Sequence, residues 1–560
     1  MTFWQRRKKR LLSQPPAPEP KTLKGRNALR KFLLSVARLF LLEQAMFMHP
    51  KIWHILASRW VKPLLIFGPF GLLALAAIGY GVANWYGQRA LDRHFESLRQ
   101  HGISTDAVSY FTGEASEEDD VFHHPAMVEE MGKNQERRLG RLFWDKLQKL
   151  SPKASSISKG NVKFARLTDY SKWGVAGVAG EKETAKKLLE ELEPERKQMI
   201  LLNEAFMRPT AVWPVVWERD PSSGTKYPSV FGSVLSFTAY ARAEANFLRL
   251  EAAAEVDDGS REWVKGQMRM IHHLENVPGT MFSSLVTRSS IAALSDSLWE
   301  ASVRGAFKED DLSAIERDLA PIDMRKMAMR ATCGELTFAS TFNQVDRFVT
   351  NPHLMRGWRS DPLSVGRRLR GVLWAVRPPG ISAMKQVAVW EEMLRSTLDE
   401  TGKVKTGFSL GDYERFRRMG EDASIGITDD DMGWVNETKD IEGKGYEMFS
   451  RFISSSLDSE AKLALLRTGI ALERYRLKYG SSPESLVLLV PEFLPAVLAD
   501  PFDSKPLRYR RQADGSPWVW SIGLNGVDDG GQPDTSNDKG DLIWITHPIP
   551  SGTGAPGVSR

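Results

Sequence analysis

The densest group of side chains that could bind a metal ion lies close to the C-terminus. Residues 523–541 are rich in glycine, and their oxygen-bearing side chains include Asp528, Asp529, Asp534, Asn537, Asp538 and Asp541. Calcium takes about six to eight oxygen ligands in a flexible geometry, so this stretch offers enough ligands for one ion. A glycine-rich acidic hairpin loop that holds no metal is the alternative interpretation.

Ser409 lies in the sequence GFSLG, which satisfies the G-x-S-x-G pattern of hydrolase nucleophiles. That motif needs a preceding strand, a surrounding sheet and a later acid and histidine. Here the preceding residues are DETGKVKT, in a region that otherwise has a helical pattern. A serine that caps the helix GDYERFRRM explains the same residues. No convergent catalytic set is evident, so we expect no enzyme, with a hydrolase using Ser409 as the alternative.

Two histidine pairs, His123–His124 and His272–His273, invite a metal hypothesis. Adjacent side chains point about 100° apart on a helix and to opposite faces on a strand, so neither pair converges easily on one ion. Cys333 is the one cysteine of the chain and excludes an intrachain disulfide. Its surroundings, MRKMAMRATCGELTF, predict a buried apolar side chain on a helix.

A long uncharged segment predicts where these candidate residues lie relative to a membrane. Lys62 and Arg89 bracket 26 residues without a charge. At about 1.5 Å per residue such a helix spans a bilayer core of about 30 Å, so we predict a transmembrane helix at residues 63–88. The run starts far from the N-terminus and ends in Asn84-Trp85-Tyr86, which favours an uncleaved anchor over a signal peptide.

Charge predicts the orientation of this anchor. Residues 1–62 carry 14 Lys or Arg against two acidic residues, whereas the whole chain has a net charge of +6. Lys and Arg that flank a span stay on the cytoplasmic side. We therefore expect a cytoplasmic N-terminus in a bacterial inner membrane and a periplasmic segment 89–560. The basic tail is attracted to anionic lipid headgroups, and nucleic-acid binding is not expected.

The N-terminal part divides into two segments. Residues 1–26 are basic and proline-rich, which predicts a disordered tail. Residues 27–62 contain the apolar stretch 27–48, which Arg38 and Glu43 interrupt. Two charges in hydrocarbon would be costly, so we expect an amphipathic helix on the lipid surface or, alternatively, on a partner protein.

A helical pattern dominates after the span. A juxtamembrane region, 89–183, combines helices and loops, and residues 184–456 form the predicted helical ectodomain. Apolar residues recur every three or four positions in four of its segments, which are 188–207, 233–256, 261–277 and 280–305. The fold class expected is mainly α, with helical hairpins stacked in a solenoid-like array.

Residues 457–550 have the pattern of a small α+β module, followed by a disordered tail at 551–560. A helical segment, 459–480, ends at a glycine, and Ser482-Pro483 then predicts a short helix. Strand candidates follow at 507–511, 518–522 and 542–546. We expect them to form a short antiparallel sheet.

This order of features resembles the globular domain of the major pseudopilin of type II secretion systems, over about residues 458–546. The matching residues are Tyr475, Gly480 and Pro483, the pairs Leu494-Pro495 and Asp500-Pro501, the segment Lys505-Pro506-Leu507, the loop residues Ser521, Gly523, Asn525 and Gly526, and Asp541-Leu542. The resemblance implies a calcium site. Its ligands would be backbone carbonyls near Ser521 and Leu524 and the carboxylates of Asp528, Asp538 and Asp541.

The rest of the chain departs from a pilin, since a basic tail and several hundred helical residues precede the module. The whole chain looks like the large membrane-anchored proteins of unassigned role found in Planctomycetes and Verrucomicrobia, which implies architecture and no activity. We expect a membrane-anchored scaffold or binding protein with a protein partner in the envelope, associated with secretion or pilus-type assembly. A signalling anchor is a further alternative.

Overall fold

The computed structural model describes most of the chain from residue 61 to residue 545. The described ranges are 61–105, 114–133, 138–150, 167–173, 178–213, 216–219, 226–229, 231–256, 260–275, 279–342, 379–424, 433–531 and 540–545. Two compact units divide the chain, residues 1–80 and 81–560. The basic tail and the amphipathic helix expected before residue 61 lie outside the described residues.

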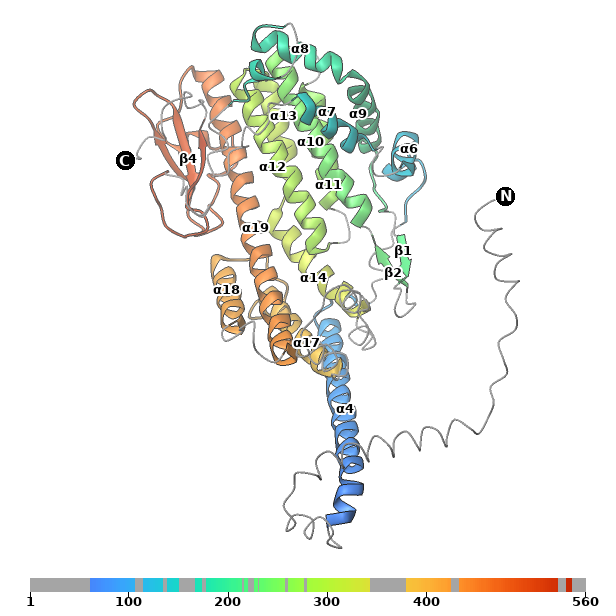
Figure 1. Ribbon diagram of the computed structural model, residues 1–560. Helices are drawn as coiled ribbons and strands as arrows, with labels where there is room; N and C mark the ends of the chain where they lie inside the picture. Colours follow the sequence, from blue (N-terminus) through green and yellow to red (C-terminus); the bar gives the residue numbers. More distant parts are fainter. Residues whose placement is uncertain are drawn as a thin grey trace, which may run out of the picture. The chain divides into compact units, whose positions relative to one another are not determined.

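Most of the described residues are helical (Figure 1). The α-helices are α4 (Val61–Gln100), α6 (Pro125–Gly132), α7 (Leu139–Leu150), α8 (Glu181–Glu191), α9 (Glu193–Phe206), α10 (Phe231–Ala254), α11 (Ser260–Glu275), α12 (Met281–Val303), α13 (Glu309–Leu319), α14 (Met324–Phe342), α17 (Pro379–Thr397), α18 (Leu410–Ser424) and α19 (Gly433–Tyr479). Short 3-10 turns are η1 (Val121–His123), η4 (Tyr170–Lys172) and η7 (Leu486–Leu489). The predicted mainly α fold is confirmed.

Helix α4 contains the whole uncharged run 63–88. Its residues are therefore in one continuous helix, as expected. Over the part of the chain that the structure describes, no helix has both the length and the apolar character needed to cross a membrane.

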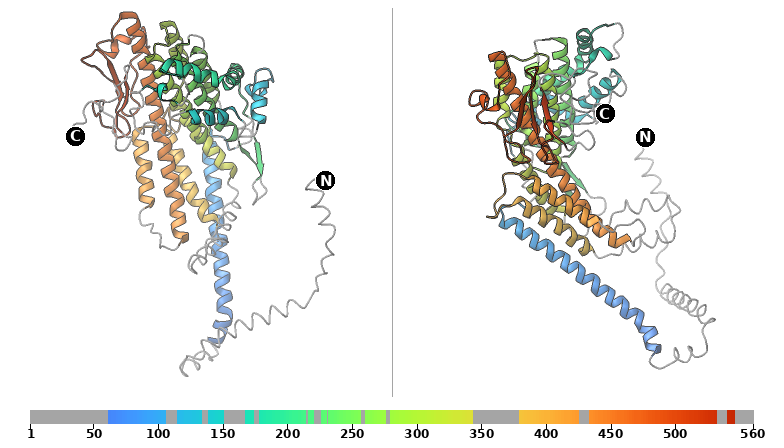
Figure 2. Two further views of the ribbon diagram at one scale, coloured as in Figure 1. Left: turned by 45° about the horizontal axis from the view of Figure 1, so that its top comes forward. Right: turned by 90° about the vertical axis from the view of Figure 1, so that its left-hand side faces the viewer.

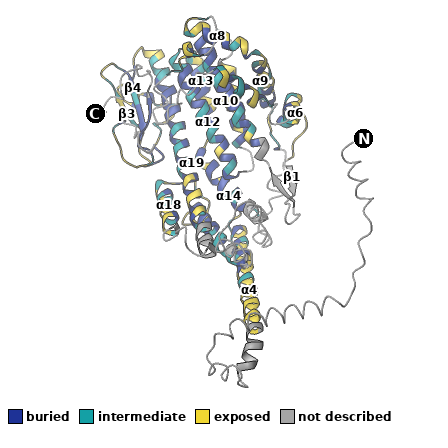
Figure 3. Cartoon of the chain, in the orientation of Figure 1, coloured by how far each residue is buried: buried dark blue, intermediate teal, exposed yellow. Residues whose placement is uncertain are grey.

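Four segments with helical periodicity correspond to α8 and α9, α10, α11 and α12. The first segment is two helices because Leu192 separates α8 from α9 and Pro194 lies in the first turn of α9. Helix α10 packs against α7, α8, α9, α11 and α12, and both α10 and α12 consist largely of buried residues (Figure 3). This arrangement is a bundle and differs from the expected row of hairpins, in which each unit would contact only its neighbours.

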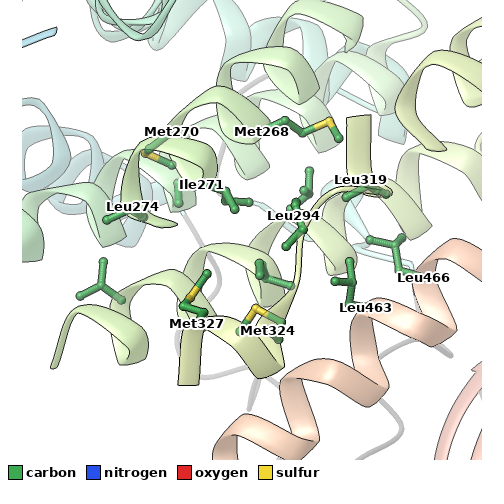
Figure 4. Close-up of a cluster of buried hydrophobic side chains, with 14 of the residues drawn as sticks. Met268, Met270, Ile271, Leu274, Leu294, Leu319, Met324, Met327, Leu463 and Leu466 are labelled. Carbon is green, nitrogen blue, oxygen red and sulfur yellow. The ribbon is translucent and has the colours of Figure 1, made fainter. Parts of the chain in front are cut away.

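Helix α19 joins parts of the second unit that are distant in sequence. It packs against α12, α13, α14, α17 and α18, and its C-terminal part carries the sheet on another side (Figures 1 and 2). Figure 4 shows a buried cluster where α11, α12, α13, α14 and α19 meet; its labelled side chains are Met268, Met270, Ile271, Leu274, Leu294, Leu319, Met324, Met327, Leu463 and Leu466.

The C-terminal sheet has the strand order β3–β4–β5, with both pairs antiparallel. Its strands are β3 (Arg508–Arg511), β4 (Pro517–Ser521) and β5 (Leu542–Ile545). These bounds agree with the three predicted strands within one residue, so the small antiparallel sheet is confirmed. The short helix expected after Ser482 is the 3-10 turn η7. The boundary expected near residue 457 falls inside α19, which belongs to both the bundle and the module.

A two-stranded hairpin of β1 (Val216–Arg219) and β2 (Lys226–Ser229) interrupts the helical region. The strands are antiparallel, with Val216 opposite Ser229 and Arg219 opposite Lys226. The helical periodicity of the flanking segments did not predict it. The Asp-Pro-Ser-Ser-Gly sequence between the strands is a turn signal that could have indicated it.

Candidate metal centre

The loop that follows β4 begins where the strand ends at Ser521. Of the five predicted ligands, Ser521, Leu524, Asp528 and Asp541 are among the described residues, and Asp538 lies outside them. The ladder between β4 and β5 pairs Ser521 with Leu542 and so brings the start of the loop next to its end. The sheet thus holds Asp541 beside the first residues of the same loop.

Asp541 is fully buried at the end of the loop. Its Oδ2 accepts a hydrogen bond from the backbone N–H of Gly531 at 2.7 Å, and its Oδ1 is buried without a hydrogen-bond partner among the described residues. Burial raises the pKa of Asp541 to about 6, and the nearby negative charges of Asp529 and Asp528 act in the same direction. The protein itself therefore leaves this carboxylate poorly neutralised.

Backbone conformation brings the loop back to Asp541. Gly530 and Gly531 have φ values of 73° and 79°, a region that side-chain-bearing residues rarely adopt. At Gly531 a Cβ atom would also lie 3.3 Å from the indole of Trp520. Glycine at these two positions allows the N–H of Gly531 to point at the buried carboxylate.

Asp528 has a different environment in the same loop. Its Oδ1 accepts hydrogen bonds from the indole N–H of Trp520 at 2.9 Å and from the backbone N–H of Gly530 at 3.0 Å. Its Oδ2 lies 3.6 Å from the guanidinium of Arg508. The hydrogen bond from Trp520 is the main cause that lowers the pKa of Asp528, so this side chain stays ionised near neutral pH.

Asp500 stabilises the start of the loop, a role that sequence reasoning did not assign to it. Its carboxylate is fully buried and accepts hydrogen bonds from Ser521 Oγ at 2.9 Å, from the N–H of Ile522 at 2.9 Å and from the N–H of Phe502 at 3.1 Å. Arg508 donates a further bond at 3.0 Å. The Ser521 side chain is thereby held on Asp500.

This site combines a buried carboxylate with further negative charges nearby. Asp541 and Asp528 lie close enough for their charges to interact, and Asp529 adds a third negative charge. Among the described residues, no group of three His, Cys, Asp or Glu side chains is placed to hold a metal.

Ser409 caps helix α18. Its Oγ donates to Asp412 Oδ2 at 2.8 Å and accepts from the N–H of Asp412 at 3.2 Å, while its own N–H donates to Asp412 Oδ2 at 2.8 Å. These reciprocal bonds have the pattern of a capping box. The hydroxyl that the hydrolase alternative would use is engaged in the cap.

The side chains of each histidine pair have different partners. His123 Nδ1 lies 2.6 Å from Asp120 Oδ2, whereas His124 accepts from the N–H of Ala126 at 3.3 Å at the start of α6. In α11 the ring of His273 is buried and bonds to the carbonyl of Phe206 at 2.8 Å, whereas the side chain of His272 is half exposed. Neither pair converges on a common point.

Cys333 lies in α14 and is largely buried. Burial raises the pKa of its thiol to about 11, which keeps it protonated at neutral pH.

Comparison with known proteins adds no relative. No known protein family matches this chain, and no curated protein or solved structure is detectably similar to it.

Proposed function

We propose that this protein is a scaffold or binding protein of a bacterial envelope, anchored in the inner membrane by α4 with residues 89–560 in the periplasm. The observation that carries the proposal is the exposure of α4 from Gly71 to Val82, where every side chain is exposed. Leu72, Leu73 and Ile78 have exposed fractions of 69%, 67% and 62%.

These exposed side chains surround the helix. Successive residues are rotated by about 100°, so Leu72, Leu73, Leu75 and Ile78 point in different directions around the axis. A helix that is apolar all round belongs in a protein core or in a membrane. In the sequence the uncharged run continues back to Pro63, which supports the membrane.

The environment of α4 changes after Val82. Trp85 and Tyr86 are half exposed, and the guanidinium of Arg89 lies 4.5 Å from the ring centroid of Trp85. Leu91 and Leu98, further along, are fully buried. Aromatic residues followed by a cation are typical of a membrane interface, so the helix would leave the bilayer here and enter the folded domain.

Helix α17 holds α4 at this boundary. Asn84 Oδ1 accepts a hydrogen bond from the N–H of Gly380 at 2.9 Å. A Cβ built at Gly87 would lie only 2.4 Å from the Cα of Gly380, so the two helices touch at their backbones. This contact supports the packing of the last part of α4 within the folded domain.

The proposed partner is a protein of the envelope, in a secretion or pilus-type assembly. This part of the proposal rests on the resemblance of the C-terminal module to the major pseudopilin. The tail at 1–26 would bind anionic lipid headgroups. A hydrolase using Ser409 and a signalling anchor that acts through residues 27–48 are the alternatives.

The proposal includes a calcium ion in the C-terminal loop. The observation that favours it is the buried Asp541 Oδ1, which has no hydrogen-bond partner among the described residues. When bound, the ion would supply the positive charge that Asp541 lacks and draw oxygen ligands from the same loop. Asp528 is available as an ionised second carboxylate.

Extraction from membranes tests the anchor. We expect the wild-type protein to stay in the membrane pellet after an alkaline carbonate wash. The double variant Leu75→Lys, Ile78→Lys should be released or fail to insert, since each lysine at the centre of a span costs roughly 3 kcal/mol. Val128→Lys, which changes an exposed apolar residue of α6, is the matched control and should stay in the pellet. Release of the wild-type protein by carbonate would contradict the anchor.

A further inference from the structure

Three polar side chains meet between α9, α10 and α11, inside the helical bundle. Glu244 of α10 and Gln267 of α11 are fully buried. Asn203 of α9 presents a buried Oδ1. No charge pattern in the sequence distinguishes these residues from those of a solvated helix face.

Contacts between the helices bring the three side chains together. A Cβ built at Gly266 would lie 2.6 Å from the amide atoms of Asn203, so only glycine leaves room for that amide. The Asn203 amide in turn lies against Glu244 and partly offsets the effect of its burial. Gln267 Nε2 donates to the carbonyl of Ala241 at 3.1 Å, one helical turn before Glu244.

The buried atoms of this cluster that lack a partner among the described residues are all oxygen atoms. They are Asn203 Oδ1, Gln267 Oε1 and the two carboxylate oxygens of Glu244, for which the Asn203 amide is the one neighbouring donor among the described residues. The amide of Gln267 donates through Nε2 to the carbonyl of Ala241, and its Oε1 is buried. Each buried acceptor without a partner costs about 1–3 kcal/mol. Acceptors cannot satisfy one another, so the cluster needs a proton, a water molecule or a cation.

Among the described residues, no basic side chain neutralises Glu244. Burial raises the pKa of Glu244 well above its ordinary value, and only the Asn203 amide acts in the opposite direction. Burial therefore favours the protonated form of this carboxyl group when no cation is bound. The single proton of Glu244 can form a hydrogen bond to only one of the other buried oxygen atoms of the cluster.

We propose that the oxygen cluster of Asn203, Glu244 and Gln267 binds an alkali cation, sodium or potassium, in exchange for the Glu244 proton. One carboxylate and one monovalent cation leave no net charge in the core, whereas a divalent ion would leave a buried positive charge. In the exchange the carboxyl O–H releases its proton to solvent and the cation takes its place among the oxygens. The ion stabilises the packing of α9 and α11 on α10.

The exchange predicts linked effects of salt and pH on the stability of the protein. A ligand that binds only the folded state raises the unfolding temperature as its concentration rises. Because the cation competes with a proton, its effect should be larger at pH 8.5 than at pH 6. We expect an unfolding temperature about 2 °C higher in sodium or potassium chloride than in choline chloride of equal ionic strength at pH 8.5.

Two variants of the full-length protein assign this shift to the cluster. Glu244→Gln keeps the shape and removes the charge, and should abolish the difference between alkali and choline salts. Glu335→Gln is the matched control, since Glu335 is a largely buried acid with a raised pKa whose carboxylate accepts the Met281 N–H at 3.3 Å. This control should keep the difference.

An infrared measurement on the wild-type protein gives a second readout that does not depend on the folding of a variant. At pH 8.5 the carbonyl band of a protonated carboxyl should weaken when sodium or potassium chloride replaces choline chloride. Equal unfolding temperatures in the three salts together with an unchanged band would overturn the proposal and leave a proton or a water molecule in the cluster. An alkali effect that persists in Glu244→Gln would also overturn it, because the ion would then bind elsewhere.

Discussion

Asp500 and Asp541 are both fully buried carboxylates of the C-terminal module, yet the protein neutralises only Asp500. Asp500 accepts four hydrogen bonds, one of them from Arg508. Asp541 faces only backbone donors, Gly531 and Asp529, among the described residues, and its Oδ1 is buried without a close hydrogen-bond partner there. This difference separates a carboxylate that stabilises the fold from one that can bind an ion.

Terbium luminescence tests the loop directly, because Trp520 lies next to Asp528 and can sensitise an ion bound there. We expect emission that calcium displaces and that Asp541→Asn weakens at least tenfold in terbium affinity. Asp514→Asn changes an acid in the turn at the other end of β4 and should leave the emission unchanged. Equal emission from Asp541→Asn and the wild-type protein would contradict the site.

The pH dependence of stability provides a second test of Asp541. Its pKa is about 6 in the folded protein and near 4 when unfolded, so the folded state binds the proton more tightly. In chelator, this residue's contribution is fully present below pH 4 and is lost as pH rises through 6, a fall in unfolding free energy on the order of 2–3 kcal/mol. Denaturant titrations should show this fall in unfolding free energy for the wild-type protein and not for Asp541→Asn. Calcium should suppress the fall in the wild-type protein. Parallel pH profiles would show that Asp541 is not the titrating group.

The sequence indicated Asp528 and Asp541 as candidate ligands, through the acidic and glycine residues concentrated in one loop and through the resemblance of the module to the major pseudopilin. It could not identify Asp500, whose role depends on Ser521 and Ile522 arriving from another strand. The cluster of Asn203, Glu244 and Gln267 was equally inaccessible. Each residue lies on a different helix, and the pattern of one helix does not show which polar position its neighbours will cover.

At the scale of elements, the packing of β5 against α19 depends on one small residue, Gly469. A Cβ built at Gly469 would lie 2.2 Å from the indole of Trp544. The glycine therefore allows the buried tryptophan to lie directly on the helix backbone. Relative to alanine, glycine at position 469 lowers the stability of the helix by about 1 kcal/mol. The close contact with Trp544 explains why a glycine nevertheless occupies this position.

Gly469→Ala should consequently destabilise the protein in spite of the better helix propensity of alanine. We expect a loss of about 1–3 kcal/mol in unfolding free energy, measured by urea denaturation followed through tryptophan fluorescence. Gly132→Ala is the control, because a Cβ there meets open space. A gain in stability for Gly469→Ala would contradict the close contact.

Periodicity predicted the elements that have a clear apolar pattern, which are α10, α11, α12 and the three strands of the module. It did not predict that α19 starts as early as Gly433, because the hydrophobic pattern is clear only in the later part of this helix. It also missed the β1–β2 hairpin, which lies between segments of helical periodicity.

At the scale of the whole molecule, charge and hydropathy divide the chain at α4. The basic excess lies in residues 1–62, and α4 is apolar and exposed from Gly71 to Val82, whereas Leu91 and Leu98 further along are fully buried. Sequence alone indicated this division, because it depends on composition along the chain. The packing of the bundle around α10, α12 and α19 required the structure, because it depends on contacts between distant segments.

The side of the membrane on which the N-terminal tail and the helical domain lie is the most direct test of the proposed α4 anchor. In a Cys333→Ala background, a single cysteine is introduced at Ser13 or at the exposed Val128, and spheroplasts are treated with a membrane-impermeant maleimide. The account predicts that Val128→Cys is labelled in intact spheroplasts and Ser13→Cys only after lysis. Labelling of Ser13→Cys with protection of Val128→Cys, or protection of both until lysis, would contradict an α4 anchor with a periplasmic domain.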